Sequence, residues 1–254
     1  MKKDIMSISE KIRDQLMPRA KGIKVRDVRI GLGYTAVLLD NGQAGVAFTF
    51  NESMKKGCTI FTGLHPLVGR DASELLTFLG SDDKIEMAVA LATANALTNT
   101  MKDGLQEGDI LEYIHVTPQD KVGMVGYFSP LLPRLKKMTS SILIFEQIKE
   151  RQGDLLPEED AYEFLPQCQV ALITSTSILN HTIENILDAA RSCREVALLG
   201  ASTPLIPGAF ADTPVTFLSG VVVARPQEML RIVSEGGGMR LFKKNVKKVN
   251  LSLQ

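Results

Sequence analysis

A glycine-rich stretch followed by an acidic residue is the first feature that could bind a ligand. Residues 123–128 end in Gly126, Tyr127 and Phe128, and Glu146 stands near the place of a ribose-binding carboxylate, about 20 residues further on. In dinucleotide-binding folds, such glycines let backbone amides approach a pyrophosphate. Here the third glycine is missing and aromatic residues replace small ones. The pattern argues against a standard NAD site and leaves a tight turn with a locally bonded Glu146 as the alternative.

A second segment, residues 174–182, is rich in hydroxyl groups and precedes a stretch with helical spacing. Hydroxyls and free backbone amides at the start of a helix favour an anion, because the helix dipole is positive there. The same residues also fit a structural role in which Asn180 or Thr182 caps the helix. The segment therefore predicts an anion-binding loop or a helix cap, and the two roles are compatible.

Two further loops combine glycine with polar or rigid residues. Residues 200–208 contain Ser202, Thr203 and Pro204, and a rigid polar loop on a scaffold is a common binding element. Residues 236–238 are three glycines, which permit close backbone approach to a ligand but also end helices. The first loop is thus a candidate binding element, with a shaped turn as the alternative. For the three glycines a helix stop and flexible hinge is favoured over a binding role.

The sequence contains no metal or nucleophile motif. Its histidines, His65, His115 and His181, have no neighbour at ligand spacing, and neither CxxC nor HExxH occurs. A metal site would have to be assembled in space, from groups such as Glu146, His181 and a cysteine. GxSxG is also missing, which argues against a serine hydrolase of that kind. Three widely spaced cysteines fit reduced, buried thiols better than a disulfide framework. They are Cys58, Cys168 and Cys193.

The elements that must position these residues change in character along the chain. In the first half, apolar spacing predicts a helix over 4–17, closed by Pro18. Three β-type runs follow, and Asn41-Gly42 supplies the hairpin turn of a small antiparallel sheet. The runs cover 24–30, 34–40 and 43–50, and two helices follow at 69–79 and 84–101.

From residue 121 short strands alternate with helices, which is the pattern of a parallel sheet with crossovers. The predicted strands are 121–126, 141–146, 170–174, 195–200 and 215–218, and the predicted helices are 130–138, 157–165, 179–192 and 226–234. Because ligands bind beyond the carboxyl ends of parallel strands, we expect these strand ends to form one functional edge. The chain is thus predicted to be α/β, with one domain over 1–116 and a second over 117–254.

Length and charge narrow the classes of function. The chain has 254 residues, 44% of them hydrophobic, which supplies a sizeable core. Its 29 basic side chains balance 29 acidic ones, so no net field favours nucleic acid or an anionic membrane. No apolar run is long enough for a membrane helix, and the N-terminus does not look like an export signal. We expect a cytoplasmic protein that binds neither nucleic acid nor membrane; a homo-oligomer is compatible with the sequence.

Seven segments, taken in order, resemble the DUF4213/DUF364 family, which is associated with heavy-metal chelation. They are residues 31–36, 94–97, 122–128, 145–146, 156–157, 173–180 with Thr182, and 199–204. The resemblance covers nearly the whole chain. It implies an enolase N-terminal-like first domain, a Rossmann-like second domain and a site in the cleft between them.

The family pattern, carried over residue by residue, gives the site candidates. They are Gly33, Tyr34, Thr35 and Asn95 in the first domain, and Gly126, Tyr127, Phe128, Glu146, Thr174, Asn180, Thr182, Ser202, Thr203 and Pro204 in the second. Where the family commonly has Thr-Gly-Thr, this chain has Ser175 in the middle. The resemblance implies a divalent transition metal, although oxygen and amide donors are not the ligands that soft metals prefer.

Three functions follow as alternatives. The first is binding of a small-molecule or metal ligand, gripped by Glu146 and the polar loops, with Tyr34 and Asn95 closing the cleft. The second is an enzyme that acts on an anionic or nucleotide-like metabolite, with Glu146 as acid/base and residues 174–182 holding phosphate or carboxylate. The third is an assembly protein whose cleft is only an interface. The sequence favours the first over the second.

Overall fold

The computed structural model describes residues 6–50, 61 and 63–253. Its helices are α1 (Ile8–Ala20), α2 (Ala72–Leu76), α3 (Lys84–Thr98), α4 (Leu132–Met138), α5 (Ala161–Phe164), α6 (Thr176–Leu179), α7 (Ile183–Ala189), α8 (Pro226–Ser234) and α9 (Met239–Phe242). Its strands are β1 (Val25–Ile30), β2 (Tyr34–Leu39), β3 (Ala44–Phe48), β4 (Gln106–Glu107), β5 (Lys121–Val125), β6 (Ser141–Glu146), β7 (Leu155–Pro157), β8 (Val170–Thr174), β9 (Glu195–Leu199), β10 (Phe217–Val223) and β11 (Val246–Ser252). No helix in this described part of the chain is long and apolar enough to cross a bilayer.

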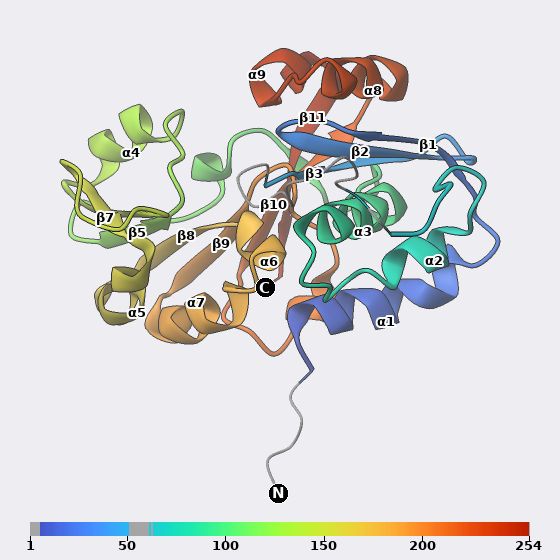
Figure 1. Cartoon of the computed structure of the whole chain (residues 1–254). Coiled ribbons are helices and arrows are strands. Elements are labelled where there is room, and N and C mark those ends of the chain that lie inside the picture. Colours follow the sequence, from blue (N-terminus) through green and yellow to red (C-terminus); the bar gives the residue numbers. More distant parts are fainter. Residues whose placement is uncertain (1–5, 51–60, 62, 254) are drawn as a thin grey trace, which may run out of the picture.

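Strands β1, β2 and β3 form the predicted antiparallel sheet, which lies between two helices (Figure 1). Helix α3 covers one face so closely that a Cβ on Gly45 would lie 2.2 Å from the Ala96 nitrogen. Helix α8 covers the other face, and a Cβ on Gly31 would lie 2.2 Å from the Val233 carbonyl oxygen. A helix from late in the chain therefore completes the packing of a sheet formed early.

The first helix departs from the prediction at its end. Pro18 was expected to close it, but Pro18 lies inside α1, which continues to Ala20. The reason is packing, because Leu16 and Ala20 are both buried against the rest of the first half. Ser7 forms a capping box with Glu10 at the other end, which fixes where the helix begins.

The second sheet has eight strands in the order β4-β11-β10-β9-β8-β5-β6-β7. The strands from β10 to β7 are parallel to their neighbours, whereas β11 and β4 are antiparallel. This sheet with its crossover helices confirms the predicted α/β class. The sequence reading missed β4, β7 and β11, all at or near the edges of the sheet. The predicted boundary at residue 116 stays a prediction.

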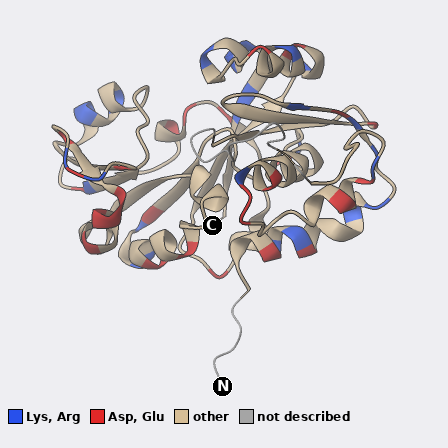
Figure 2. Cartoon of the chain, in the orientation of Figure 1, with Lys and Arg blue, Asp and Glu red and all other residues tan. Residues whose placement is uncertain are grey.

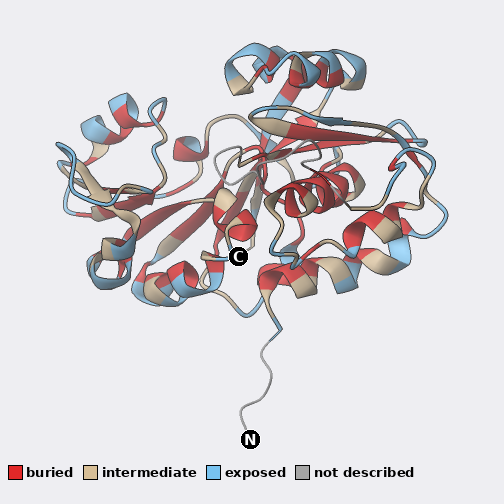
Figure 3. Ribbon diagram, in the orientation of Figure 1, coloured by how far each residue is buried: buried red, intermediate tan, exposed pale blue. Residues whose placement is uncertain are grey.

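The central strands bury both faces, so their sequences are apolar without interruption. Met124 and Leu172 point to one face, where they join a cluster with Leu135 of α4. Val125 and Ile173, the next residues along, belong to the other cluster, on the face covered by α5 and α7. Figure 3 shows the resulting buried layer through the middle of the molecule. The period of two in the strands thus fixes which side chains reach each layer.

One buried asparagine bonds the two halves to each other. Asn99, the residue that ends α3, donates from Nδ2 to the carbonyl oxygens of Thr203 (2.9 Å) and Val221 (3.2 Å). Its Oδ1 accepts from the backbone nitrogen of Leu205 at 2.9 Å. All of these groups lie in the interior, where an unpaired backbone group is costly. Asn99 therefore anchors the end of α3 to the second sheet.

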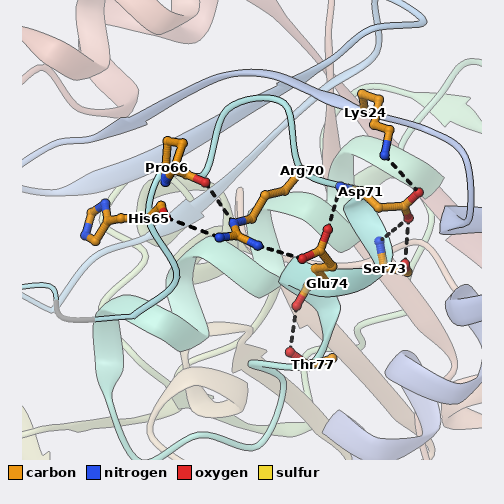
Figure 4. Close-up of polar contacts among 8 residues, drawn as sticks. All are labelled: Lys24, His65, Pro66, Arg70, Asp71, Ser73, Glu74 and Thr77. Atoms are coloured by element: carbon orange, nitrogen blue, oxygen red, sulfur yellow. Dashed lines mark hydrogen bonds and ion pairs between the residues drawn. The ribbon is translucent and has the colours of Figure 1, made fainter.

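A polar cluster fixes the segment before α2 (Figure 4). Arg70 donates to the Pro66 carbonyl oxygen and to Glu74 Oε2, both at 2.8 Å. Asp71 and Glu74 form a capping box at the start of α2, and Lys24 lies 3.7 Å from the Asp71 carboxylate. These bonds join the start of β1 to α2 at the surface of the first half.

Candidate functional site

The strand order reverses between β5 and β8, and a cavity lies at the carboxyl ends of these strands. The chain runs from β5 outward to β6 and β7, then returns to the other side of β5 as β8. In open α/β sheets this switch point is where ligands bind. The cavity has a volume of about 350 Å³, and we call it the switch-point cavity. It is lined by Phe48, Phe50, Gly126, Tyr127, Phe128, Glu146, Gln147, Glu158, Thr174 and Thr176.

Gly126 is required at the end of β5 for two reasons. Its φ of +90° lies in the region that side chains avoid. A Cβ there would also lie 2.9 Å from Cβ of Thr174, the last residue of the neighbouring strand. The backbone nitrogen of Gly126 still donates to the Phe145 carbonyl oxygen at 2.8 Å, so the strand remains paired up to the turn. Glycine thus allows β5 and β8 to end side by side.

Glu146 lines the cavity with a carboxylate whose orientation is fixed by the backbone. Its Oε2 accepts a hydrogen bond from the Tyr127 nitrogen and its Oε1 one from the Gln147 nitrogen, each at 2.9 Å. The local bonding considered from the sequence is therefore present. It coexists with a position on the cavity wall, because the half-buried side chain still borders the cavity.

The loop after β8 is closed by its own hydroxyl groups. Thr174 Oγ1 lies 2.9 Å from Thr176 Oγ1, and Ser177 Oγ donates to the Thr174 carbonyl oxygen at 2.6 Å. Ser175 replaces the family's glycine without strain, since its φ of −70° is ordinary for any residue. Its buried Oγ has no hydrogen-bond partner in the described structure and lies 3.0 Å from the Cβ position of Gly200.

The charge on the described lining of the cavity is negative. Glu146 and Glu158 are its only charged side chains among the described residues. The rest of the wall is largely aromatic, with Phe48 and Phe50 packed edge to face at 5.1 Å. Figure 2 shows acidic residues on the ribbon beside the β7 edge of the sheet. Carboxylates beside aromatic rings favour a positively charged ligand and disfavour an anion.

Two other cavities adjoin the switch-point cavity. The first, of about 350 Å³, shares Tyr127 and Phe128 with it and is mainly apolar. It also contains Tyr34, whose ring packs edge to face on Phe48 and Phe242, and burial raises the pKa of its phenol. Tyr127 stands between the two cavities with 53% of its surface exposed, which is high for an aromatic side chain.

The second neighbour, of about 710 Å³, shares Gln147 and Glu158 with the switch-point cavity and contains Asn180 and Thr182. These two predicted site residues bond to each other, because the Thr182 hydroxyl donates to Asn180 Oδ1 at 2.8 Å. Thr182 stands at the cap position of α7 but makes no side-chain cap bond. Both residues therefore lie near the switch point without lining that cavity.

Of the remaining predicted residues of the first half, Asn95 and Thr35 are buried and Gly33 is half-buried. The Asn95 side chain is buried on α3 and donates to the Val46 carbonyl oxygen at 2.8 Å. Thr35 Oγ1 bonds with Thr49 Oγ1 at 2.9 Å, and the Gly33 carbonyl oxygen accepts from the Thr49 nitrogen. In these positions they hold the small sheet together and do not line the switch-point cavity.

The loop after β9 connects the two halves. Ser202 Oγ accepts from the Phe48 nitrogen at 2.8 Å, which places Phe48 beside the switch-point cavity. Thr203 and Pro204 are buried next to it, outside the lining. Ser202 therefore positions a lining residue rather than lining the cavity itself.

The site candidates did not include Phe48, Phe50, Gln147, Glu158 and Thr176, although Gln147 and Thr176 belong to strand ends that were expected to form the functional edge. No motif marks them, since they come from separate segments that only the sheet order brings together. The one signal available was the expectation that strand ends converge. Gln147 follows β6 directly, Thr176 stands two residues beyond β8, and Glu158 follows β7, a strand that was not predicted.

The described residues do not assemble a soft-metal site. No group of three or more His, Cys, Asp or Glu side chains among them could hold a metal ion. Burial raises the pKa of Cys168 to about 11 and that of Cys193 to about 12, so both are protonated thiols at neutral pH. Cys58 lies outside the described residues. The oxygen donors at the switch point, with Glu146 and Glu158, suit a hard cation better than a soft one.

Comparison with known proteins gives matches to both halves of the chain. The family model DUF364, described as "putative heavy-metal chelation", matches residues 109–252. The model DUF4213, with the same description, matches residues 13–98. An uncharacterised protein of Methanocaldococcus jannaschii is 24% identical over 257 residues, and the match covers 98% of each chain.

Two crystal structures of proteins with unknown function from the DUF364 family share the fold. The one from Pyrococcus horikoshii has a TM-score of 0.85 and 22% identity, covering 97% of this chain and 100% of that one. The one from Desulfitobacterium hafniense DCB-2 has a TM-score of 0.79 and 21% identity, covering 96% and 98%. At these identities the similarity supports the architecture of the whole chain.

Proposed function

Since the chain belongs to the DUF364 family, which is described as "putative heavy-metal chelation", we propose that it binds a small positively charged ligand or a metal complex in the switch-point cavity. The observation that carries this proposal is the pair of carboxylates, Glu146 and Glu158, in an aromatic-walled cavity with no basic side chain among its described residues. The place of the cavity at the reversal of strand order adds support.

Each part of the cavity has a role in this proposal. Glu146 is held in one orientation by two backbone N–H groups, so it presents its charge without a loss of side-chain freedom on binding. Glu158 supplies a second charge to the wall, directly after Pro157 of β7, the residue that pairs with Glu146. The aromatic rings, including Phe48 and Tyr127, would contact the apolar body of the ligand and its positive charge.

A metal carried in a complex fits these residues better than a soft metal held directly by the protein. The described cavity offers carboxylate, amide and hydroxyl oxygens, and soft metals prefer thiolate and imidazole. In a complex, the inner ligands come from the small molecule, and the protein contributes charge and shape. The protein would then recognise the outer surface of the chelate.

The alternative of an enzyme acting on an anionic metabolite has less support. Glu146 and Glu158 would repel an anion at the switch point. The hydroxyl groups of Thr174 and Thr176 are bonded to each other, and Thr182 is bonded to Asn180. The Thr182 hydroxyl and one of the two threonine hydroxyls at positions 174 and 176 thus donate within the loop that was expected to hold phosphate or carboxylate.

The test is a thermal-shift titration of metal-stripped protein, with Glu158→Gln as the variant. Glu158 makes no side-chain bond with a described residue, so the substitution removes charge from the cavity with little effect on the fold. The probes are tetramethylammonium, hexaamminecobalt(III) and aqueous Ni²⁺. We expect at least one cation to raise the melting temperature by about 3 °C near saturation, and Glu158→Gln to lose most of this rise.

Glu163→Gln is the matched control, because Glu163 is an exposed glutamate on α5 that lines none of the three cavities. It should keep the full response. Equal responses in both variants would show that the cations act on general surface charge. Stabilisation by citrate or AMP alone, with no response to cations, would also contradict the proposal and favour the anionic alternative.

A further inference from the structure

A separate cavity lies between the two halves, at the end of α1. It has a volume of about 340 Å³ and shares no residue with the switch-point cavity. It is lined by Gln15, Leu16, Arg19, Thr98, Lys102, Leu205, Ile206, Pro207 and Gly208. Arg19 and Lys102 are its only charged side chains among the described residues, so its charge is opposite to that of the switch point.

We propose that this cavity, which we call the basic cavity, binds the carboxylate or phosphate group of a small organic anion between Arg19 and Lys102. The two side chains have different geometries that complement each other. The guanidinium of Arg19 is planar and can donate two parallel hydrogen bonds to an oxyanion, and the ammonium of Lys102 is a compact point charge. Together they supply more than one charge to a single acid group.

Neither cation is neutralised within the described structure. No described carboxylate forms an ion pair with Arg19 or Lys102, and neither side chain has a hydrogen-bond partner there. Lys11, which lies on the same helix as Arg19, is by contrast paired with Asp212 at 3.4 Å. An anion would supply the missing partner for both.

The electrostatics of Lys102 show that the two charges act on each other. Burial lowers the pKa of the Lys102 ammonium, and the positive charge of Arg19 lowers it further. No described acid offsets either effect. Both side chains are exposed at the rim of the cavity, where an anion between them would offset their repulsion.

The remaining lining residues indicate what the rest of the ligand should contain. The side-chain amide of Gln15 lies against Gly208, where a Cβ would be 2.7 Å from its Oε1 and 2.9 Å from its Nε2. This amide has no hydrogen-bond partner among the described residues and can donate to an acid oxygen. Leu16, Leu205 and other apolar side chains also line the cavity. The predicted ligand thus combines an acid group with a small apolar body.

The helix dipole alone does not account for this arrangement. A cation near the carboxyl end of a helix is favourable, and Arg19 lies in the last turn of α1 while Lys102 follows α3. That effect is local to each helix, and either charge would satisfy it when pointing to solvent. The helix-dipole effect therefore does not explain why both positive charges line the same cavity, where they repel each other.

The experiment compares Arg19→Gln and Lys102→Gln with Lys21→Gln. Lys21 is exposed just beyond α1, carries the same charge and does not line the cavity, so its loss controls for general surface charge. The probes are inorganic phosphate, phenyl phosphate and butyrate, each compared with chloride at the same ionic strength. The readout is the melting temperature, followed by calorimetric titration with the most effective probe.

We expect at least one probe to raise the melting temperature of the wild type and of Lys21→Gln by about 3 °C at ten times its dissociation constant. Both cavity variants should lose the response. Without the probe, Lys102→Gln should melt higher than the wild type, because the repulsion from Arg19 is gone. A stronger effect of phenyl phosphate than of butyrate identifies a phosphate ligand, and the reverse identifies a carboxylate.

Equal stabilisation of the three variants, or equal stabilisation by chloride, would overturn the proposal. So would the failure of every probe to bind the wild type in the calorimeter. None of these outcomes depends on the switch-point cavity, since the two sets of lining residues are disjoint. The two proposals can therefore fail independently.

Discussion

At the scale of single residues, the candidate site depends on places where only one residue type fits. Gly126 permits the close approach of β5 and β8, and the two backbone bonds to Glu146 fix a carboxylate at the same edge. The sequence pointed to both residues, because a glycine that ends a strand and an acid that ends the next one are visible without a structure. It did not show what they face.

Replacing Gly126 with alanine should be more damaging than a positive φ alone explains. The new Cβ would meet Cβ of Thr174 at 2.9 Å, in addition to the backbone strain at φ +90°. We expect Gly126→Ala to lower the free energy of unfolding by about 3 kcal/mol, measured by urea denaturation. Gly153→Ala is the control, because Gly153 has φ +60° and open space at its Cβ position, and should cost about 1 kcal/mol. Equal losses would mean that the contact with Thr174 is irrelevant.

Two asparagines, Asn95 and Asn99, show that residue type alone does not reveal which side chain matters more for the structure. The family resemblance singled out Asn95, yet the structure gives the larger number of bonds to Asn99, four positions later and one turn further along α3. Both are asparagines on the same side of one helix, and nothing local in the sequence distinguishes them. The difference arises from the loop after β9, whose Thr203 and Leu205 backbone groups bond to Asn99.

At the scale of elements, prediction succeeded where a segment is buried on one or both sides. The central strands β5, β8 and β9 are apolar throughout, and the hairpin of β2 and β3 has its Asn41-Gly42 turn. Strands β7 and β11 were missed because they lie toward the edges of the sheet, where β7 is short and β11 has two consecutive exposed lysines between its buried valines. β7 is too short and β11 too polar to stand out from loops.

Mutation at the end of α3, where Asn99 bonds the two halves to each other, should therefore destabilise the protein. Asn99→Ala removes bonds to two carbonyl oxygens and one backbone nitrogen, all in the interior. We expect a loss of about 3 kcal/mol in the free energy of unfolding. Asn95→Ala removes one bond and also the unpartnered Asn95 Oδ1, so its loss should be about 1 kcal/mol. If urea denaturation gave the larger loss for Asn95→Ala, the bonds of Asn99 would not be the main connection between the two halves.

At the scale of the molecule, the two halves share their interior. The largest core cluster joins Ile12 and Leu91 of the first half to Ile173 and Ile186 of the second. A second contact joins the end of the chain to its beginning, because helix α8 packs on strands β1 and β2. Composition and motif order suggested two successive domains, since a linear reading cannot detect a late helix that returns to an early sheet.

This shared interior predicts a single unfolding transition. If neither half keeps its packing without the other, tyrosine fluorescence and far-UV circular dichroism should follow one curve in urea, and the calorimetric enthalpy should equal the van't Hoff enthalpy. Of the four tyrosines, Tyr34 lies in the first half, Tyr113 lies close to the predicted boundary, and Tyr127 and Tyr162 lie in the second half. Two separate transitions, or a fluorescence change that precedes the loss of helix, would show that the halves unfold independently.

The return of α8 to the first sheet also sets the order of events during synthesis. Strands β2 and β3 leave the ribosome early, with Ala36, Leu38 and Val46 on a face that is later covered by Leu230 and Val233. Until α8 is translated, that apolar face has no partner from its own chain. The nascent protein must therefore carry a half-covered sheet through most of its elongation, a period in which a chaperone or a neighbouring nascent chain could occupy the same face.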